Sequence, residues 1–245
     1  MIRKIDVLVL GGGYGKRLFA ELDLPKYTPK GLIPIEGTTG LDMGLRTFSK
    51  SLIGKIIIET NREGALAYSD WIDRHKEYDS QLFIEPRSSP TSCLGVLETL
   101  EYFYQELKPE KPILLMAPDN IFFQNQDHLI LNSEIADVKV LTYNLSKLSE
   151  VSKYGALVTE GNKIVECEEK PAEPKSRLIK TAYEIWKPSI FEGLNEWNKE
   201  GDSDKVGEYL NHMIQKKFKI ISIPTKGEWI DIGAKKDFIK AKTKI

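Results

Sequence analysis

Short apolar runs alternate with helical stretches along the first half of this chain, and this alternation limits the possible folds more than any other feature. The apolar runs are IDVLVL, KIIIET, QLFIE and PILLMAPDN, and helices are expected near residues 41–50, 63–75 and 93–107. Strands that alternate with helices predict a parallel sheet covered by helices on both faces. Ligands of such a sheet bind at the carboxyl ends of its strands.

The pattern changes after Asp137, where strand-like segments follow one another. These segments are VKVLTYN, GALVTE, KIVECEE and LIKTAYEIW, and they predict an antiparallel or mixed sheet with room for an acceptor pocket. Helices over 188–199 and 204–217, the strand KIISIP and a helix from Ala234 are expected to follow. We expect one domain over 1–245, with a first half at about 1–136 and a second half at about 137–245.

The composition argues against several classes of protein. The formal net charge is -1, so no overall positive field favours nucleic acid as a partner. Two cysteines and three histidines, without metal-ligand spacing, indicate neither a disulfide framework nor a zinc site. No apolar run approaches the ~18 residues of a membrane span, and no signal sequence is recognisable. We therefore expect a cytoplasmic protein with no membrane partner.

A glycine-rich turn, VLGGGYGKRL at residues 9–18, directly follows the first predicted strand. It matches neither the dinucleotide fingerprint G-x-G-x-x-G nor the P-loop G-x-x-x-x-G-K-[ST]. Consecutive glycines still allow backbone N–H groups to converge on an anion. The turn therefore predicts a phosphate loop of a third kind, and a tight turn without a ligand is the open alternative.

Polar residues suited to phosphate chemistry follow in several separate segments. Lys26 and Lys30 lie in LPKYTPKGLIPIEG, a proline-rich loop suited to a polyanion. Asp119 follows a buried strand, where it could hold Mg²⁺ or cap a helix. EEKPAEPK and EWIDIGA add four further charged residues: Glu168, Glu169, Lys170 and Asp231.

Taken together, these segments resemble one family. The chain shows GGYGKRL, PKGLIPI, PDNIFF, YGALV, EEKPAEPKS and WIDIG in this order. They resemble GGxGTRL, PKxLxPI, GDNIFY, YGV, EEKPxxPKS and WLDTG of the sugar-1-phosphate nucleotidylyltransferases, most closely the glucose-1-phosphate thymidylyltransferase branch. The resemblance implies an α/β fold with a Rossmann-like mixed, mostly parallel sheet flanked by helices, the nucleotide-diphospho-sugar transferase fold.

The same resemblance implies a nucleotide-binding half at about 1–136, a sugar-phosphate-binding half at about 137–245, and roles for individual residues. Arg17 and Lys30 would be catalytic, and Lys26 is the competing candidate for the lysine. Asp119 and Asp231 would hold Mg²⁺. Nucleotide-binding residues would be Leu10, Gly11, Gly12, Gly13, Gly15, Glu85 and Thr91, and sugar-phosphate-binding residues would be Gly155, Glu169 and Lys170.

The implied reaction transfers a nucleotidyl group from an NTP, dTTP or UTP, to a sugar 1-phosphate such as glucose 1-phosphate. Three departures bear on this: Lys16 replaces a threonine, extra residues separate Arg17 from the lysine, and EPRSSPTSCLG lacks the usual glycines. Glu85-Pro86 followed by Thr91 also resembles the EPxxxNT segment of mannose-1-phosphate guanylyltransferases. A guanylyl- or cytidylyltransferase, or a non-catalytic nucleotide or sugar-phosphate sensor, is therefore an alternative.

The segment after Gly233, AKKDFIKAKTKI, supplies only a short apolar stripe on a lysine-rich helix. We expect this helix to pack on its own core. The expected assembly is a monomer or a small homo-oligomer without the tetrameric arrangement of the family.

Overall fold

The computed structural model describes residues 4–13, 15, 18, 21–22, 28–86 and 94–245. Two compact units interleave along the chain. The first, unit 1, comprises Met1–Cys93, Leu115–Asp127 and Lys226–Ile245, and the second, unit 2, comprises Leu94–Leu114 and His128–Thr225. The prediction from the sequence instead divided the chain at about residue 136, and its single domain stays a prediction.

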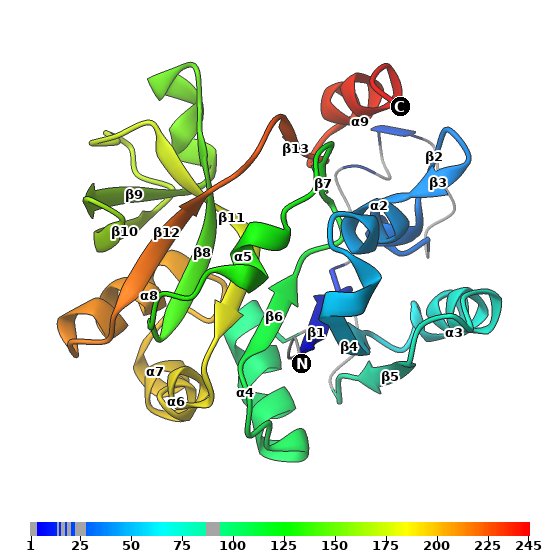
Figure 1. The fold of residues 1–245 in the computed structure, drawn as a ribbon, viewed down its shortest axis with the longest axis horizontal. Coiled ribbons are helices and arrows are strands. Elements are labelled where there is room, and N and C mark those ends of the chain that lie inside the picture. The colour runs from blue at the N-terminus through cyan, green and yellow to red at the C-terminus, as the bar shows by residue number, and fades with distance from the viewer. Residues whose placement is uncertain (1–3, 14, 16–17, 19–20, 23–27, 87–93) are drawn as a thin grey trace. The chain divides into compact units, whose positions relative to one another are not determined.

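Unit 1 contains the parallel strands that the alternating pattern predicts. Strands β1 (Ile5–Leu10), β4 (Ile53–Thr60) and β5 (Ser80–Ile84) pair in parallel in the order β5-β4-β1 (Figure 1). Helix α3 (Ala65–Arg74) connects β4 to β5 along the chain. Leu10 is in register with Glu59. The carboxyl ends of β1 and β4 therefore lie side by side, next to the glycine turn.

Short elements complete unit 1. The hairpin β2 (Pro34–Ile35) with β3 (Thr38–Thr39) and the antiparallel pair β7 (Asn120–Phe122) with β13 (Trp229–Asp231) were not predicted as pairs. Helix α9 (Lys235–Lys242) packs Ala241 and Phe238 against a buried cluster that includes Ile33, Ile121 and Ile230. The expectation that this helix packs on its own core is therefore confirmed. The remaining elements are η1 (Lys30–Leu32), α2 (Gly40–Arg46) and η2 (Lys50–Leu52).

Unit 2 contains the predicted mixed sheet. Its strands follow the order β11-β8-β12-β10-β9, with β9 also pairing to β11. The pair β8–β12 is parallel, and β8–β11, β9–β10, β9–β11 and β10–β12 are antiparallel. The strands are β8 (Val138–Asn144), β9 (Gly155–Glu160), β10 (Lys163–Glu169), β11 (Leu178–Trp186) and β12 (Ile220–Pro224).

The other elements are α4 (Val96–Leu107), α5 (Asp127–Leu131), η3 (Leu148–Lys153), α6 (Pro188–Glu192), α7 (Leu194–Glu200) and α8 (Val206–Gln215). Strand β6 (Ile113–Met116) contributes residues to both units.

Two predicted helices differ from the structure. The helix expected over 41–50 ends at Arg46, and the helix expected over 188–199 is divided into α6 and α7 at Gly193. A Cβ atom at Gly193 would lie 2.8 Å from the Tyr209 hydroxyl, so the close approach of Tyr209 requires a glycine there. Glycine is a weak helix former, and the helix breaks at this position.

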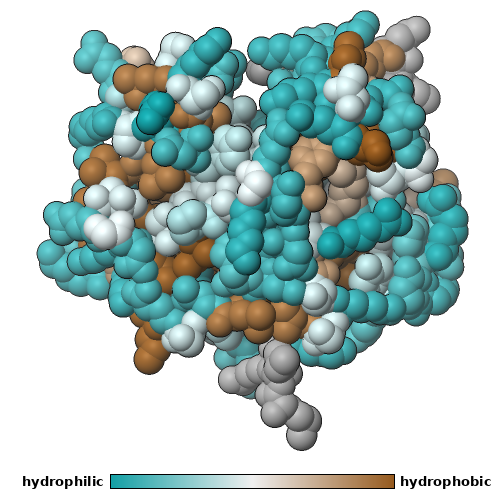
Figure 2. Space-filling model, turned by 45° about the horizontal axis from the view of Figure 1, so that its top comes forward, coloured by the Kyte–Doolittle hydropathy of each residue, from teal (hydrophilic) through white to brown (hydrophobic). Residues whose placement is uncertain are grey.

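One face of the molecule carries mostly polar side chains (Figure 2). Figure 2 shows a face on which hydrophilic residues predominate and hydrophobic residues occur in separate groups. Among the described residues, no helix combines the length and the apolar character that crossing a membrane requires.

Candidate functional site

The glycine turn is held by the end of strand β4. The Gly11 N–H donates to the Glu59 backbone carbonyl at 2.9 Å, and the Gly12 N–H donates to Glu59 Oε2 at 3.1 Å. Asn61 Nδ2 donates to the Gly12 carbonyl at 2.7 Å. A Cβ atom at Gly11 would lie 2.7 Å from the Glu59 backbone carbonyl oxygen, so the close approach of the turn to β4 requires a glycine there.

The use of these amides bears on the predicted phosphate loop. The N–H groups of Gly11 and Gly12 already have acceptors on Glu59, so their role in the structure is to shape the turn. Gly13 is exposed, with open space where a Cβ would project, and Gly15 has a φ of 54° that favours glycine. The predicted contact with an anion is therefore best supported at these two residues.

Glu59 is buried beneath the turn with a second acidic residue nearby. Burial and the charge of Glu85 raise the pKa of Glu59 to about 8, against the opposing effect of the Gly12 and Gly11 amides. Neither Glu59 Oε1 nor the hydroxyl of the fully buried Tyr68 has a hydrogen-bond partner among the described residues. Glu59 is therefore largely a neutral acid at pH 7 and adds little negative charge beneath the turn.

Close packing of small residues brings Lys30 to Asp119. Pro118 packs closely against Gly31 and Gly40. A Cβ atom at Gly31 would lie 2.6 Å from the Pro118 ring, and a Cβ atom at Gly40 would lie 2.2 Å from the Pro118 carbonyl oxygen. The residue after Pro118 and the residue before Gly31 are thus neighbours. Lys30 Nζ forms a short ion pair with Asp119 Oδ2.

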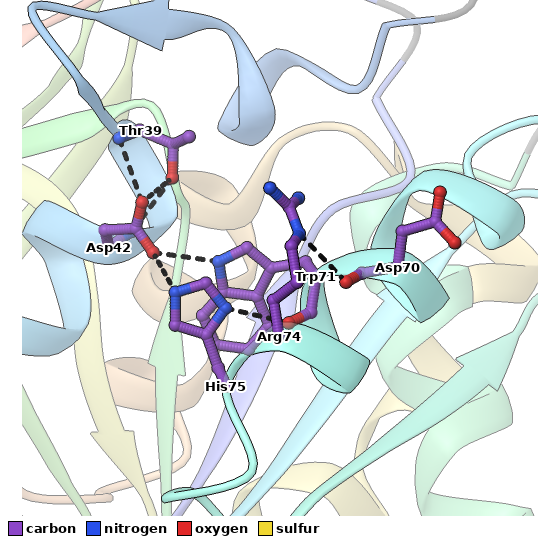
Figure 3. Close-up of polar contacts among 6 residues, drawn as sticks. All are labelled: Thr39, Asp42, Asp70, Trp71, Arg74 and His75. Carbon is purple, nitrogen blue, oxygen red and sulfur yellow. Dashed lines mark hydrogen bonds and ion pairs between the residues drawn. The ribbon is translucent and has the colours of Figure 1, made fainter.

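Helix α2, which begins at Gly40, is anchored by Asp42 (Figure 3). Asp42 Oδ2 accepts from the backbone and the hydroxyl of Thr39 at 3.0 and 2.7 Å. Asp42 Oδ1 accepts from Trp71 Nε1 at 2.8 Å and lies 3.3 Å from His75 Nε2. The Trp71 and His75 rings are stacked with centroids 4.2 Å apart, so α2 is tied to the end of α3.

Asp119 and Asp231 form the candidate metal site of unit 1. Asp119 lies between β6 and β7, so the alternative that it caps a helix is wrong. Asp231 pairs with Asn120 across β13 and β7, and the Ile232 N–H donates to the Asp119 carbonyl at 2.9 Å. The two carboxyl groups are therefore neighbours.

The charges of this pair fit a divalent cation. Burial opposes ionisation of Asp119, but the Lys30 ammonium outweighs burial and lowers the pKa of Asp119. Burial and the charge of Asp119 raise the pKa of Asp231 to about 7. A hard cation such as Mg²⁺ binds carboxylate oxygens and would stabilise both charges. Because no group of three or more candidate ligands occurs among the described residues, phosphate oxygens or water would complete the coordination.

The predicted sugar-phosphate residues lie together in unit 2. Gly155 on β9 pairs with Glu169 on β10, and Glu169 Oε2 accepts from the Gly207 N–H at 3.1 Å. Lys170 Nζ lies 3.8 Å from Glu169 Oε1 and is exposed. Lys170 has a φ of 47°, a left-handed conformation that costs a lysine ~1 kcal/mol and is enriched at functional sites.

Of the other predicted residues, the structure describes Leu10 and Glu85. Leu10 ends β1 and is half-buried, and Glu85 is buried with its N–H donating to the Thr60 carbonyl at 3.0 Å. Arg17, Thr91 and the competing Lys26 lie outside the described residues.

Sequence reasoning missed several buried polar residues at these sites: Glu59, Asn61, Tyr68, Lys180 and Glu184. A charged residue inside an otherwise apolar strand, as in KIIIET and LIKTAYEIW, is the signal that could have identified three of them.

A family model described as "Nucleotidyl transferase" matches residues 6–245. Among curated proteins, the chain is 25% identical over 235 residues to a mannose-1-phosphate guanyltransferase from Debaryomyces hansenii, covering 95% of this chain and 62% of that protein. It is 23% identical over 246 residues to a UTP–glucose-1-phosphate uridylyltransferase from Haloferax volcanii, covering 98% and 96%. For several other curated relatives, the chain spans only about half to two thirds of the relative's length, for example 54% of a bifunctional GlmU protein from Methanococcus aeolicus and 63% of a glucose-1-phosphate adenylyltransferase from Bacillus licheniformis.

Solved structures share this fold. A proposed glucose-1-phosphate thymidylyltransferase from Bacillus anthracis superposes with a TM-score of 0.81 at 19% identity, covering 98% of this chain and 94% of that one. An apo UDP-glucose pyrophosphorylase gives a TM-score of 0.78 at 20% identity, covering 98% and 97%. The mixed α/β nucleotide-diphospho-sugar transferase fold is thereby confirmed.

Proposed function

Because this chain belongs to the nucleotidyl transferase family, we propose that it transfers a nucleotidyl group from an NTP to a sugar 1-phosphate. A phosphate oxygen of the sugar forms a bond to the α-phosphorus, the bond from that phosphorus to the bridging α–β oxygen breaks, and pyrophosphate leaves. The products are an NDP-sugar and pyrophosphate. The observation that carries the proposal is the meeting of Lys30, Asp119 and Asp231 in unit 1.

This cluster supplies what the reaction needs. The attacking phosphate is already ionised at neutral pH, so no general base is required. The difficulty is the approach of two anions, which cations must offset. Mg²⁺ held by Asp119 and Asp231 would neutralise phosphate charge, while the Lys30 ammonium would donate to phosphate oxygens.

The glycine turn and unit 2 would hold the two substrates. Gly13 and Gly15, with Arg17, would bind the triphosphate through backbone and guanidinium N–H groups. In unit 2, Glu169 would accept hydrogen bonds from sugar hydroxyls, and the exposed Lys170 ammonium would bind the sugar phosphate.

The resemblance in sequence favours dTTP or UTP as the nucleotide and glucose 1-phosphate as the acceptor. Glu85 favours GTP as a second candidate, because a buried carboxylate can accept from the N–H donors of guanine. The relative from Debaryomyces hansenii is a mannose-1-phosphate guanyltransferase.

Pyrophosphate release tests the proposal across all pairings of ATP, GTP, CTP, UTP and dTTP with common sugar 1-phosphates and Mg²⁺. We expect one pairing to dominate. Lys30→Ala should lower its kcat by ~10²–10³-fold, as for removal of one preorganised donor. Lys26→Ala is the matched control with a small effect, and the reverse result would reassign the catalytic lysine. Release at background level in every pairing would overturn the proposed function.

A further inference from the structure

Lys180 lies beside the predicted sugar-phosphate residues of unit 2. Gly155 on β9 pairs with Glu169 on one side, and on its other side Ala156 of β9 is in register with Ile179 of β11. Glu169 and Lys180 thus flank Gly155 on neighbouring strands. A Cβ atom at Gly155 would lie 2.9 Å from Lys180 Cγ, 2.8 Å from Lys180 Cδ and 3.4 Å from Glu169 Oε2.

These distances give Gly155 a second role. The methylene chain of Lys180 crosses the space that any side chain at residue 155 would occupy. The glycine therefore permits Lys180 to lie flat over β9, close to Glu169. The Lys180 side chain therefore lies against the Gly155–Glu169 pair.

The Lys180 ammonium is fixed in place by its neighbours. Lys180 Nζ donates to Glu184 Oε1 at 2.6 Å, and Glu184 Oε2 accepts from Trp186 Nε1 at 2.7 Å. The Lys180 and Glu184 side chains are 10% and 3% exposed. Burial disfavours the charged form of Lys180, but Glu184 and Glu169 outweigh burial and raise its pKa, so the ammonium stays charged.

The hydrogen bonds of this ammonium are incomplete within the part of the chain that the structure describes. An ammonium has three N–H donors, and here Glu184 accepts from one of them. A buried donor without an acceptor is costly. A hydroxyl oxygen of a bound sugar can accept from the remaining donors.

We propose that Lys180 is a specificity-determining residue of the sugar-phosphate site, donating to hydroxyl oxygens of a neutral hexose 1-phosphate. The inference rests on the proposed function. The Lys180 and Glu184 charges cancel, so a sugar carboxylate gains no net attraction. An amino sugar whose ammonium replaces the hydroxyl that faces Lys180 loses this hydrogen bond, because neither ammonium can accept one.

Kinetics and calorimetry with Lys180→Met/Glu184→Gln test the inference. The double variant removes both charges at similar volume, and a glutamine oxygen at position 184 can still accept from Trp186 Nε1, which avoids a buried unpaired charge. Lys216→Met is the matched control, because Lys216 pairs with Glu196 on the surface.

We expect the double variant to bind the best neutral hexose 1-phosphate ~10–100-fold more weakly, with the KM for the NTP changed less than about twofold. Lys216→Met should match the wild type in both constants. Unchanged hexose phosphate binding in a folded double variant, or an equal rise in both KM values, would overturn the role of Lys180.

The wild type supplies an independent measurement should the double variant not fold. It should use the neutral hexose 1-phosphate at least ~10-fold more efficiently than one or more of its 2-, 3-, 4- and 6-amino counterparts, the discrimination expected where an ammonium replaces an accepting hydroxyl. Equal or better use of all four amino sugars would refute the inference while leaving the proposed function intact. No pyrophosphate release with any pairing would instead refute the proposed function.

Discussion

Glu59→Gln should change how the stability of this protein depends on pH. Burial and the charge of Glu85 raise the pKa of Glu59 from 4.5 to about 8, so the folded state keeps this carboxyl protonated at pH values where the unfolded chain ionises it. The contribution of Glu59 is fully present below pH 4.5 and is lost as the pH rises through 8. Glutamine does not titrate, and its oxygen can still accept from the Gly12 N–H.

The size of the effect follows from the two pKa values. Between pH 5 and pH 8, linkage with these values removes about 3–4 kcal/mol of stability from the wild type through Glu59. Any fixed cost of the amide in Glu59→Gln is the same at both pH values and cancels in the difference. The variant should therefore gain about 3–4 kcal/mol relative to the wild type on going from pH 5 to pH 8.

Urea unfolding of both proteins at the two pH values measures this difference, provided that the slopes with denaturant agree. Glu168→Gln is the control, because it makes the same chemical change at an exposed glutamate on a strand. A Glu59→Gln protein whose stability tracks the wild type across this range would show that Glu59 is ionised in the folded state, and the account of the glycine turn would be wrong.

Other residues give predictions of different kinds. Asp119→Asn and Asp231→Asn should each weaken Mn²⁺ binding measured by calorimetry and nearly abolish turnover, since each removes a carboxylate from the two-carboxylate site; unchanged Mn²⁺ affinity would refute the assignment. Lys170→Ala should raise the KM for the sugar phosphate far more than the KM for the NTP. A larger rise in the KM for the NTP would show that Lys170 does not bind the sugar phosphate. Gly40→Ala should lower the free energy of unfolding by ~1–3 kcal/mol, because the alanine Cβ would lie 2.2 Å from the Pro118 carbonyl oxygen. The gain in helix propensity, about 1 kcal/mol, is too small to offset this clash. Thermal unfolding of the variant at or above the wild-type temperature would contradict the prediction.

The strands of unit 2 show what a sequence pattern can predict. The bounds of β8, β9, β10 and β11 match the segments expected from apolar content and turn residues. Each of these segments is short, rich in β-branched and aromatic residues, and bounded by polar or turn-forming residues. Apart from the β9–β10 hairpin, whose strands are joined by Gly161 and Asn162, the pairing partners were not predictable, because they depend on contacts between segments far apart in the chain.

The polar residues at the sites show where a pattern fails. Lys30, Asp119 and Asp231 were found because their segments resemble a family, and the structure then shows why they meet, through glycines packed on Pro118 and the pairing of β7 with β13. Glu59 and Lys180 lie inside strands, where alternation cannot tell a buried polar residue from a solvent-exposed one. Their burial depends on the neighbouring strand, which in each case brings a glycine against the side chain.

The two lysine–carboxylate pairs differ in burial in a way that matches their proposed roles. The Lys30 and Asp119 side chains are 22% and 21% exposed, whereas those of Lys180 and Glu184 are 10% and 3% exposed. A partly solvated pair can exchange partners at modest cost, as Lys30 must do when Asp119 binds a cation and phosphate oxygens approach. A buried pair cannot separate without leaving an uncompensated charge. The exchangeable pair thus lies where charge would move during the proposed reaction, and the fixed pair lies where we propose that a neutral sugar is recognised.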